Sequence, residues 1–142
     1  MGKRLIGSVG LAIAGGTPSP YTRTTSFVIA CSDETTALTT GTKVTFRLPY
    51  DYTITEVRAS LTTAGTGANL VTLDFEQNTT SILSTKITID AGELTSTTAS
   101  TPPVILTSAL SDDASITCDV DQIDSGGVSA GLKMYLIGYK TL

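Results

Sequence analysis

The feature that most constrains the fold of this chain is a repeated alternation of apolar and polar residues between residues 26 and 139. Val44, Phe46 and Leu48, for example, are separated by single polar residues. Successive side chains of a β-strand point to opposite faces of the sheet, so this period of two is typical of strands with one face in a core. No window of ten or more residues keeps the 3.6-residue apolar period of a helix. The alternation therefore predicts an all-β chain.

The alternating segments are short and separated by turn residues, which is the pattern of an antiparallel β-sandwich or a small barrel. Ile54 is out of phase with the apolar residues that follow it, which predicts a β-bulge near Thr55. The strands expected from the pattern are Ser26–Cys31, Thr42–Leu48, Thr53–Thr62, Asn69–Glu76, Ser81–Asp90, Val104–Leu106, Ser115–Asp121 and Leu132–Tyr139.

The sequence divides near Thr17-Pro18-Ser19-Pro20, where two prolines favour a stiff, extended joint. No further linker or change in composition follows. A chain of 142 residues is long enough to bury one core without metals or disulfides. We therefore expect an N-terminal arm over residues 1–25 and one β-sandwich domain over residues 26–142.

The N-terminal segment has two interpretations. Lys3-Arg4 followed by an apolar stretch and Ala12-Ile13-Ala14 has the outline of a secretory signal. Glycines and a serine interrupt the apolar stretch, however, and it is too short to span a bilayer. We favour an extended assembly arm that becomes ordered by packing on another surface. Its expected contact residues are Leu5, Ile6, Val9, Leu11 and Ile13.

The residue types argue against an enzyme. The sequence contains no histidine, so the commonest general base is missing and a serine or cysteine nucleophile would lack its usual partner. Two carboxylate pairs could in principle hydrolyse a glycoside, Asp74 with Glu76 and Asp119 with Asp121. We interpret both pairs as solvated strand faces. We expect no catalytic residues and no cofactor.

Metal and nucleic-acid sites are also disfavoured. A structural zinc site needs four ligands, and the chain offers two distant cysteines and no histidine. The acidic region 112–124 could hold calcium, but its spacing lacks the order of a dedicated loop, so we interpret it as edge charges. Net charge is −4 and the nine basic residues are dispersed, which argues against a nucleic-acid partner. We expect no metal and no membrane partner.

Cys31 and Cys118 permit at most one disulfide. Cys118 shares the apolar parity of Ile116 and Val120, and a buried free cysteine behaves as a small hydrophobic residue. Two free core thiols are the favoured interpretation, and a single disulfide is the alternative.

Tyr50 and Tyr52 flank a predicted loop. Exposed tyrosines can stack on sugars or anchor a protein partner, and they can equally close the end of a core. We note both as candidates for surface recognition.

Four segments resemble a domain found in structural proteins of tailed bacteriophages. They are Ser32–Tyr50, Ile82–Asp90, Ser96–Ala99 and Asp119–Ile123, in the family's order, and the similarity extends over about residues 27–139. The resemblance implies a virion component with a jelly-roll-like sandwich, commonly trimeric, without catalytic residues. Residues 1–25 depart from the family's pattern.

The resemblance leaves two placements open. In the first, the chain is a capsid decoration or cement protein on the particle exterior, a homotrimer that sits on the major capsid protein and grips its neighbours through the arm. In the second, it is a tail-fibre or tail-tip head that binds a host receptor, such as a surface glycan. The short chain and the apolar arm favour decoration. In both, the protein is assembled into the virion in the host cytoplasm.

Overall fold

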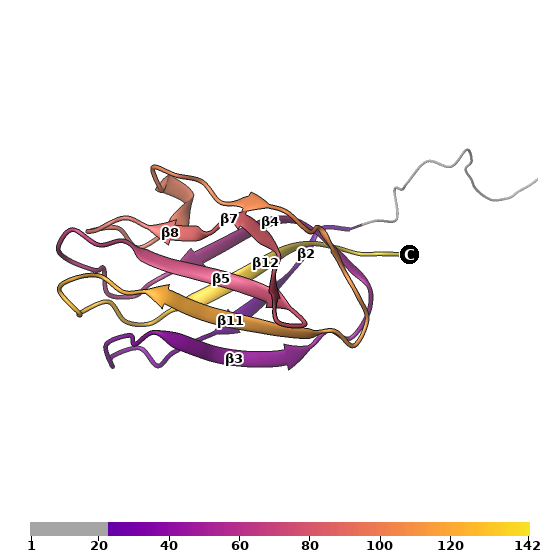
Figure 1. The fold of residues 1–142 in the computed structure, drawn as a ribbon, viewed down its shortest axis with the longest axis horizontal. Helices are drawn as coiled ribbons and strands as arrows, with labels where there is room; N and C mark the ends of the chain where they lie inside the picture. Colours follow the sequence, from indigo (N-terminus) through magenta and orange to yellow (C-terminus); the bar gives the residue numbers. More distant parts are fainter. Residues whose placement is uncertain (1–22) are drawn as a thin grey trace, which may run out of the picture.

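The computed structural model describes residues 23–142, which form antiparallel β-strands in two facing layers (Figure 1). One sheet has the strand order β10-β4-β12-β2, and the other has the order β3-β11-β5-β6, with β8 also paired to β5. The strands are β2 (Thr25–Ala30), β3 (Gly41–Arg47), β4 (Tyr52–Ser60), β5 (Val71–Gln77), β6 (Thr80–Ser81), β7 (Leu83–Thr85), β8 (Ile87–Ile89), β9 (Val104–Ile105), β10 (Ala109–Leu110), β11 (Ser115–Gln122) and β12 (Lys133–Lys140).

The regular structure of residues 23–142 includes no α-helix, and its one helical element is the short 3₁₀ turn η2 (Ser96–Thr98). The predicted all-β, antiparallel sandwich is therefore confirmed. None of the described elements is a helix long and apolar enough to cross a membrane.

The core lies between the inner faces of the two sheets. Met134 and Leu136 on β12 are fully buried, as are Leu73 and Phe75 on β5 and Ile116 on β11. Burial of each such side chain contributes about 1.5–3 kcal/mol relative to its exposure to water. Because alternate residues of the long strands supply these side chains, the period of two in the sequence places the core.

The bulge predicted near Thr55 is present. Ile137 of β12 pairs with Glu56 and the next residue, Gly138, pairs with Ile54, so Thr55 is the extra residue on β4. The bulge lets Ile54 and Val57 both point into the core. Gly138 allows the two strands to approach closely here, since a Cβ at this position would lie 2.0 Å from the Thr53 carbonyl oxygen.

Two parts of the sheet differ from the sequence prediction. The strand expected over Ser81–Asp90 is broken into β6, β7 and β8, and β7 pairs with β9 in a separate two-stranded sheet. The Ser81 side chain contributes to the break, because its Oγ accepts a hydrogen bond from the Leu83 N–H (3.1 Å). Strand β10 was not expected, since two residues are too few to show alternation.

Asp124 ties together two loops at one end of the sandwich and is only 2% exposed. Its carboxylate accepts hydrogen bonds from the Ser129 hydroxyl (2.5 Å) and from the backbone N–H groups of Thr66 (3.0 Å), Val128 (3.2 Å) and Ser129 (3.2 Å). Burial raises the pKa of Asp124, but these hydrogen bonds outweigh it and lower the pKa to about 2.

Asp124→Ala should destabilise the domain at pH 7 by about 3 kcal/mol, because it leaves several buried donors without an acceptor. A lowered folded-state pKa gives stability that is present above the ordinary value of 3.8 and lost as the pH falls toward 2. Urea unfolding at pH 7 and at pH 2–3 measures both effects. The exposed Asp112→Ala is the control, and an unchanged unfolding free energy in Asp124→Ala would contradict the assignment.

Candidate functional site

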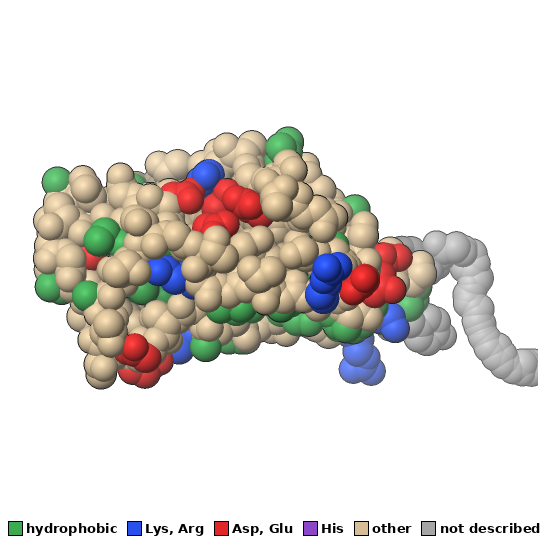
Figure 2. All heavy atoms as spheres, turned by 60° about the horizontal axis from the view of Figure 1, so that its bottom comes forward, with side chains coloured by type: hydrophobic (Ala, Val, Ile, Leu, Met, Phe, Trp, Pro, Cys, Tyr) green, Lys and Arg blue, Asp and Glu red, His purple; other side chains and the backbone are tan. Residues whose placement is uncertain are grey.

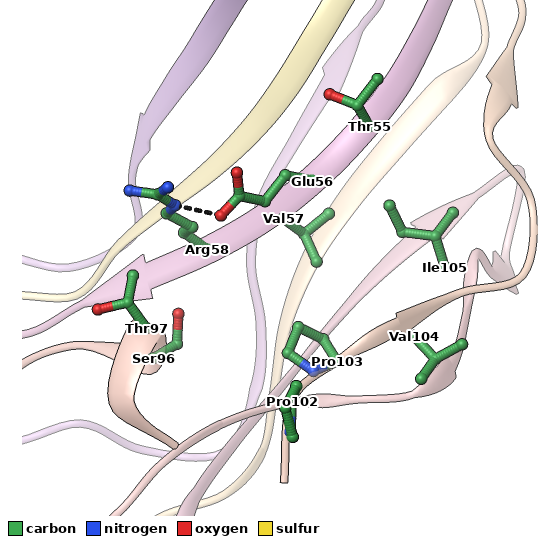
Figure 3. Close-up of a pocket in the computed structure, with 10 residues that line it drawn as sticks. All are labelled: Thr55, Glu56, Val57, Arg58, Ser96, Thr97, Pro102, Pro103, Val104 and Ile105. Carbon is green, nitrogen blue, oxygen red and sulfur yellow. Dashed lines mark hydrogen bonds and ion pairs between the residues drawn. The ribbon is translucent and has the colours of Figure 1, made fainter. Parts of the chain in front are cut away.

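A groove of about 640 Å³ lies between the outer face of β4 and the segment that runs from η2 to β9 (Figure 3). A second hollow of about 260 Å³ shares Arg58 and Thr97 with it and extends across β12 to β2. The lining residues of the larger groove are Thr55, Glu56, Val57, Arg58, Ser96, Thr97, Pro102, Pro103, Val104 and Ile105. The two hollows adjoin at Arg58 and Thr97 on the outer face of this sheet.

An ion pair lies in the groove. The Arg58 Nε donates to Glu56 Oε2 at 2.5 Å, and this contact raises the pKa of Arg58. Both side chains are about half exposed, so the pair contributes little to stability. Pro102 and Pro103 provide apolar surface opposite the ion pair (Figure 3).

Hydroxyl groups lie near the ion pair in the two hollows. Ser60 Oγ and Tyr135 Oη are hydrogen-bonded at 2.9 Å. Ser96 Oγ accepts from the Ala59 N–H at 2.9 Å and so fixes η2 against β4. Hydroxyls, a charged pair and apolar ring faces can together contact a polyhydroxylated ligand, and the groove presents no nucleophile paired with a base.

Sequence reasoning did not single out this groove. Its residues come from β4 and from the segment around η2, which are some forty residues apart in the chain. They carry no motif of fixed spacing, so only the fold brings them together.

Tyr52 is fully buried, so the prediction that it takes part in surface recognition is wrong. Its ring packs edge-on to Phe27 at 5.0 Å, and its hydroxyl donates to the Thr25 carbonyl oxygen at 2.9 Å. The strand parity of β4 turns this residue inward, where it closes one end of the core. Burial raises the pKa of Tyr52.

Tyr50 is half-buried and packs against the same aromatic cluster. Its ring lies 6.1 Å from that of Phe27, and Lys140 Nζ lies 5.2 Å from the ring centroid. Recognition of a ligand by Tyr50 stays a prediction.

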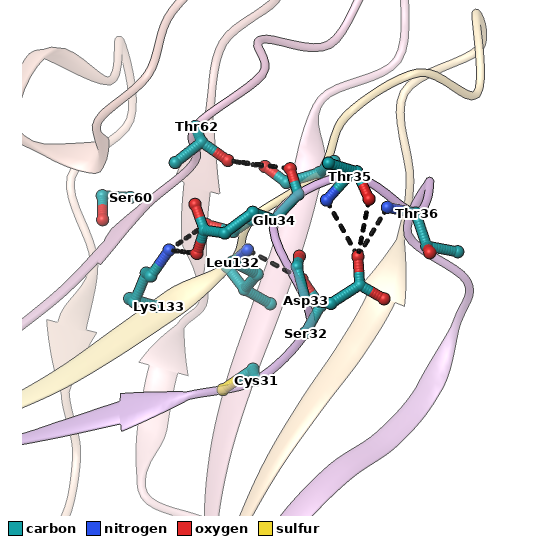
Figure 4. A network of polar contacts seen from close by, with 12 residues as sticks. Cys31, Ser32, Asp33, Glu34, Thr35, Thr36, Ser60, Thr62, Leu132 and Lys133 are labelled. Carbon is teal, nitrogen blue, oxygen red and sulfur yellow. Dashed lines mark hydrogen bonds and ion pairs between the residues drawn. The ribbon is translucent and has the colours of Figure 1, made fainter.

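The loop after β2 is held by its own polar contacts (Figure 4). Asp33 Oδ1 accepts from the N–H groups of Thr35 (2.8 Å) and Thr36 (2.6 Å), which lowers the pKa of Asp33. Glu34 pairs with Lys133 at the start of β12. The loop therefore fixes the C-terminal end of β2 against the neighbouring strand.

The carboxylates Asp74, Glu76, Asp119 and Asp121 gather on the outer face of the second sheet, and Figure 2 shows such a cluster of acidic side chains beside a basic one. The interpretation of these pairs as solvated strand faces is wrong for two members, because Asp74 is 2% and Asp119 is 9% exposed. Two groups compensate the buried Asp74. Lys86 Nζ lies 3.2 Å from its carboxylate and 2.6 Å from that of Asp121, and the Ser81 hydroxyl donates to Asp74 at 2.7 Å.

Glu76 is the member of this cluster that its surroundings disfavour as an anion. Burial raises its pKa, and Asp119, Asp74 and Asp121 raise it further. Over residues 23–142, no three side chains of the kinds that ligate metals are grouped as a metal site.

Cys31 and Cys118 are both buried and free, as the favoured interpretation predicted. The neighbouring Cys118 lowers the pKa of Cys31, while the Cys31 thiol and burial raise the pKa of Cys118. The two thiols contribute to the core from opposite sheets. The predicted arm residues Leu5, Ile6, Val9, Leu11 and Ile13 lie outside the described residues.

Comparison with known proteins gives no family for this chain. No protein-family model, curated protein or solved structure matches it.

Glu76→Gln should stabilise the domain at neutral pH, because it removes a desolvated carboxylate that faces three others. A raised folded-state pKa opposes folding at higher pH, and this penalty disappears as the pH falls below the ordinary value of 4.5. The variant's unfolding free energy should exceed the wild type's at pH 7, and the difference should shrink at pH 4. Chemical denaturation at both pH values measures it, with Asp112→Asn as control. A Glu76→Gln variant that is less stable than the wild type at pH 7 would contradict the claim that the Glu76 charge destabilises the folded domain.

Proposed function

We propose that this chain is a structural protein of a tailed-bacteriophage virion, a trimeric decoration protein on the capsid exterior that docks through its N-terminal arm. The observation that carries the proposal is a sandwich with a complete core of its own over Thr25–Lys140, preceded by an uncharged apolar segment outside that domain. A domain with its own core and an apolar extension is better suited to binding neighbouring proteins than to catalysis.

The segments that resemble the phage domain lie mainly in the second sheet and in the loops beside it. They include the loop after β2 with β3, the strands β7 and β8, the turn η2, and part of β11. The strands in these segments belong to the second sheet (β3, β8 and β11) and to the small two-stranded sheet (β7), so the resemblance concerns several elements and not a single site. The all-β fold agrees with the sandwich that this resemblance implies.

The docking mechanism is physical. The sandwich buries its own core, and the apolar residues of the arm gain burial by packing on a neighbouring surface. Leu5, Ile6, Val9, Leu11 and Ile13 would each contribute about 1–2 kcal/mol on partial burial, before the cost of ordering the arm. Threefold repetition multiplies the grip, because once one arm is bound the others dock at a high effective concentration.

Replacing the five apolar arm residues by serine should abolish incorporation into particles and leave the domain folded. Incorporation is measured by quantitative mass spectrometry of purified virions from a phage whose own gene carries the replacement, and folding by circular dichroism of the isolated variant. Ser8→Ala is the matched control. Wild-type copy numbers in the hundreds per particle support decoration. Full incorporation of the serine variant would show that the apolar arm residues are not required for docking.

The groove on the first sheet favours a second candidate, a tail-fibre or tail-tip head that binds a host glycan. Its exposed hydroxyls, ion pair and proline rings offer hydrogen bonds and apolar contact to a sugar. In this case the copy number would be a few dozen or fewer per virion.

If the chain is a receptor-binding head, a glycan array should give specific hits with the wild-type protein, and Arg58→Ala should reduce that binding at least tenfold. Arg47→Ala is the matched control, because Arg47 is also exposed and paired but lies on the other sheet. A wild-type protein without hits, or an Arg58→Ala variant that binds equally well, would exclude the groove as a glycan site.

A further inference from the structure

The edge strands of the two sheets differ in how they are protected from pairing with another chain. An exposed edge presents unpaired N–H and C=O groups, and proteins usually protect it by shortness, charge, proline or a bulge. The edge strands β10, β6 and β8 have only two or three residues each. The edge strand β3 is longer, but it carries Lys43 and Arg47, and its pairing with β11 is shifted between Cys118 and Asp119.

Strand β2 has none of these protections. Its sequence, Thr-Ser-Phe-Val-Ile-Ala, spans six residues and contains no charge, proline or glycine. Its pairing with β12 is regular along its whole length. Among the described strands β2 pairs with β12 alone, so its other edge is available.

The register shows which backbone groups face that free edge. The Cys31 N–H, one residue beyond β2, donates to the Leu132 carbonyl oxygen at 2.9 Å. In an antiparallel pair such hydrogen-bonded positions alternate with positions whose backbone groups point the other way. The N–H and C=O groups of Ser26, Val28 and Ala30 therefore point away from β12. Val28 also has a side chain that is 60% exposed.

A partly exposed apolar seam runs beside this edge, where β2 of one sheet faces β3 of the other. It consists of Phe27 and Ile29 with Val44, Phe46 and Tyr50, all of which pack against the core without being fully buried. The rings of Phe27 and Phe46 are 6.3 Å apart across the seam. Figure 2 shows hydrophobic side chains in a row along this side of the molecule. A strand added to β2 would cover the seam with one of its faces.

The sequence before the domain contains a segment that fits this edge. Between residues 5 and 22 there is no charged residue, and Leu5, Val9, Leu11 and Ile13 all fall at odd positions. In an extended strand these four share one face with Gly7, while Ile6 lies on the opposite face, which carries only the small residues Ser8, Gly10 and Ala12 beyond it. Nine residues in β geometry reach about 30 Å, which exceeds the roughly 20 Å length of a six-residue strand.

We propose that residues 5–13 of one copy of this chain add as a strand to the free edge of β2 in a second copy, with the odd-numbered apolar residues over the seam. The inference rests on the proposed function, in which the arm grips a neighbour, and it identifies that neighbour and the receiving site. Backbone hydrogen bonds to residues 26, 28 and 30 hold the strand, and the seam selects its apolar face. The contact is head-to-tail, so it closes into a ring when three copies complete a rotation.

The test removes one outward-facing backbone donor. Val28→Pro deletes the central N–H of the free edge and no hydrogen bond to β12, and proline is tolerated at such an edge position. Val28→Thr keeps the donor and the branched shape, and is the matched control. By sedimentation equilibrium on the full chain, wild type and Val28→Thr should associate to trimers, and Val28→Pro should associate at least tenfold more weakly. Circular dichroism and the melting temperature check that each variant is folded.

A second pair tests the register of the arm and serves even if Val28→Pro fails to fold. Leu11→Asp puts a charge on the face over the seam, whereas Ala12→Asp puts it on the opposite face. Association should weaken at least tenfold in Leu11→Asp and stay near wild type in Ala12→Asp. Equal effects of the two variants would overturn the proposed strand. So would a wild-type chain that is monomeric at all concentrations, or a folded Val28→Pro that forms normal trimers. Failure of the virion role, by contrast, would appear as absence of the wild-type protein from particles.

Discussion

The interior between the central strands β11 and β12 is the constraint on which the other features of this fold depend. Each strand has neighbours on both sides within its sheet. Each also directs alternate apolar side chains toward the other sheet, and these side chains are almost completely buried. Once Met134, Leu136 and Ile116 occupy that space, the parity of every long strand is fixed, because a slip by one residue would exchange inner and outer faces. The outer faces are then free to vary, and the groove and the acidic cluster lie there.

The period of two made the long strands predictable, including the bulge at Thr55, because alternation is a local property of the sequence. The features that were missed depend on distant segments. Asp74 has the outward parity of a solvated residue, yet the segment carrying Ser81 and Lys86 folds over it and compensates its charge. Tyr52 looked like a loop residue because Pro49 marks a turn before it, but β4 begins at Tyr52 itself and points its ring inward. Neither outcome is encoded in the spacing of nearby residues.

The groove was beyond sequence reasoning for a related reason. The proline, threonine and serine residues around η2 form no sequence motif that indicates a site. In the sequence, Arg58 is one of several polar residues in an alternating strand. The contact of Ser96 with the backbone of β4 brings them together. Strand parity, which depends on where each strand begins, decides the position of the tyrosines: Tyr135, which was not singled out, borders the smaller hollow, and Tyr52 lies in the core.

The contrast between β2 and β3 connects the fold to assembly. Both are edge strands on the same side of the sandwich, with comparable lengths, yet only β3 carries basic residues. An uncharged edge beside an apolar seam is a hazard for a protein that remains alone, since it can template non-specific strand pairing. The hazard disappears if a specific strand occupies the edge. A charge on β2 would protect the free protein, but a strand added at that edge would desolvate the charge beside apolar side chains. Protection and the proposed strand addition therefore favour different residues at the same six positions. The uncharged sequence of β2 is the one that strand addition requires.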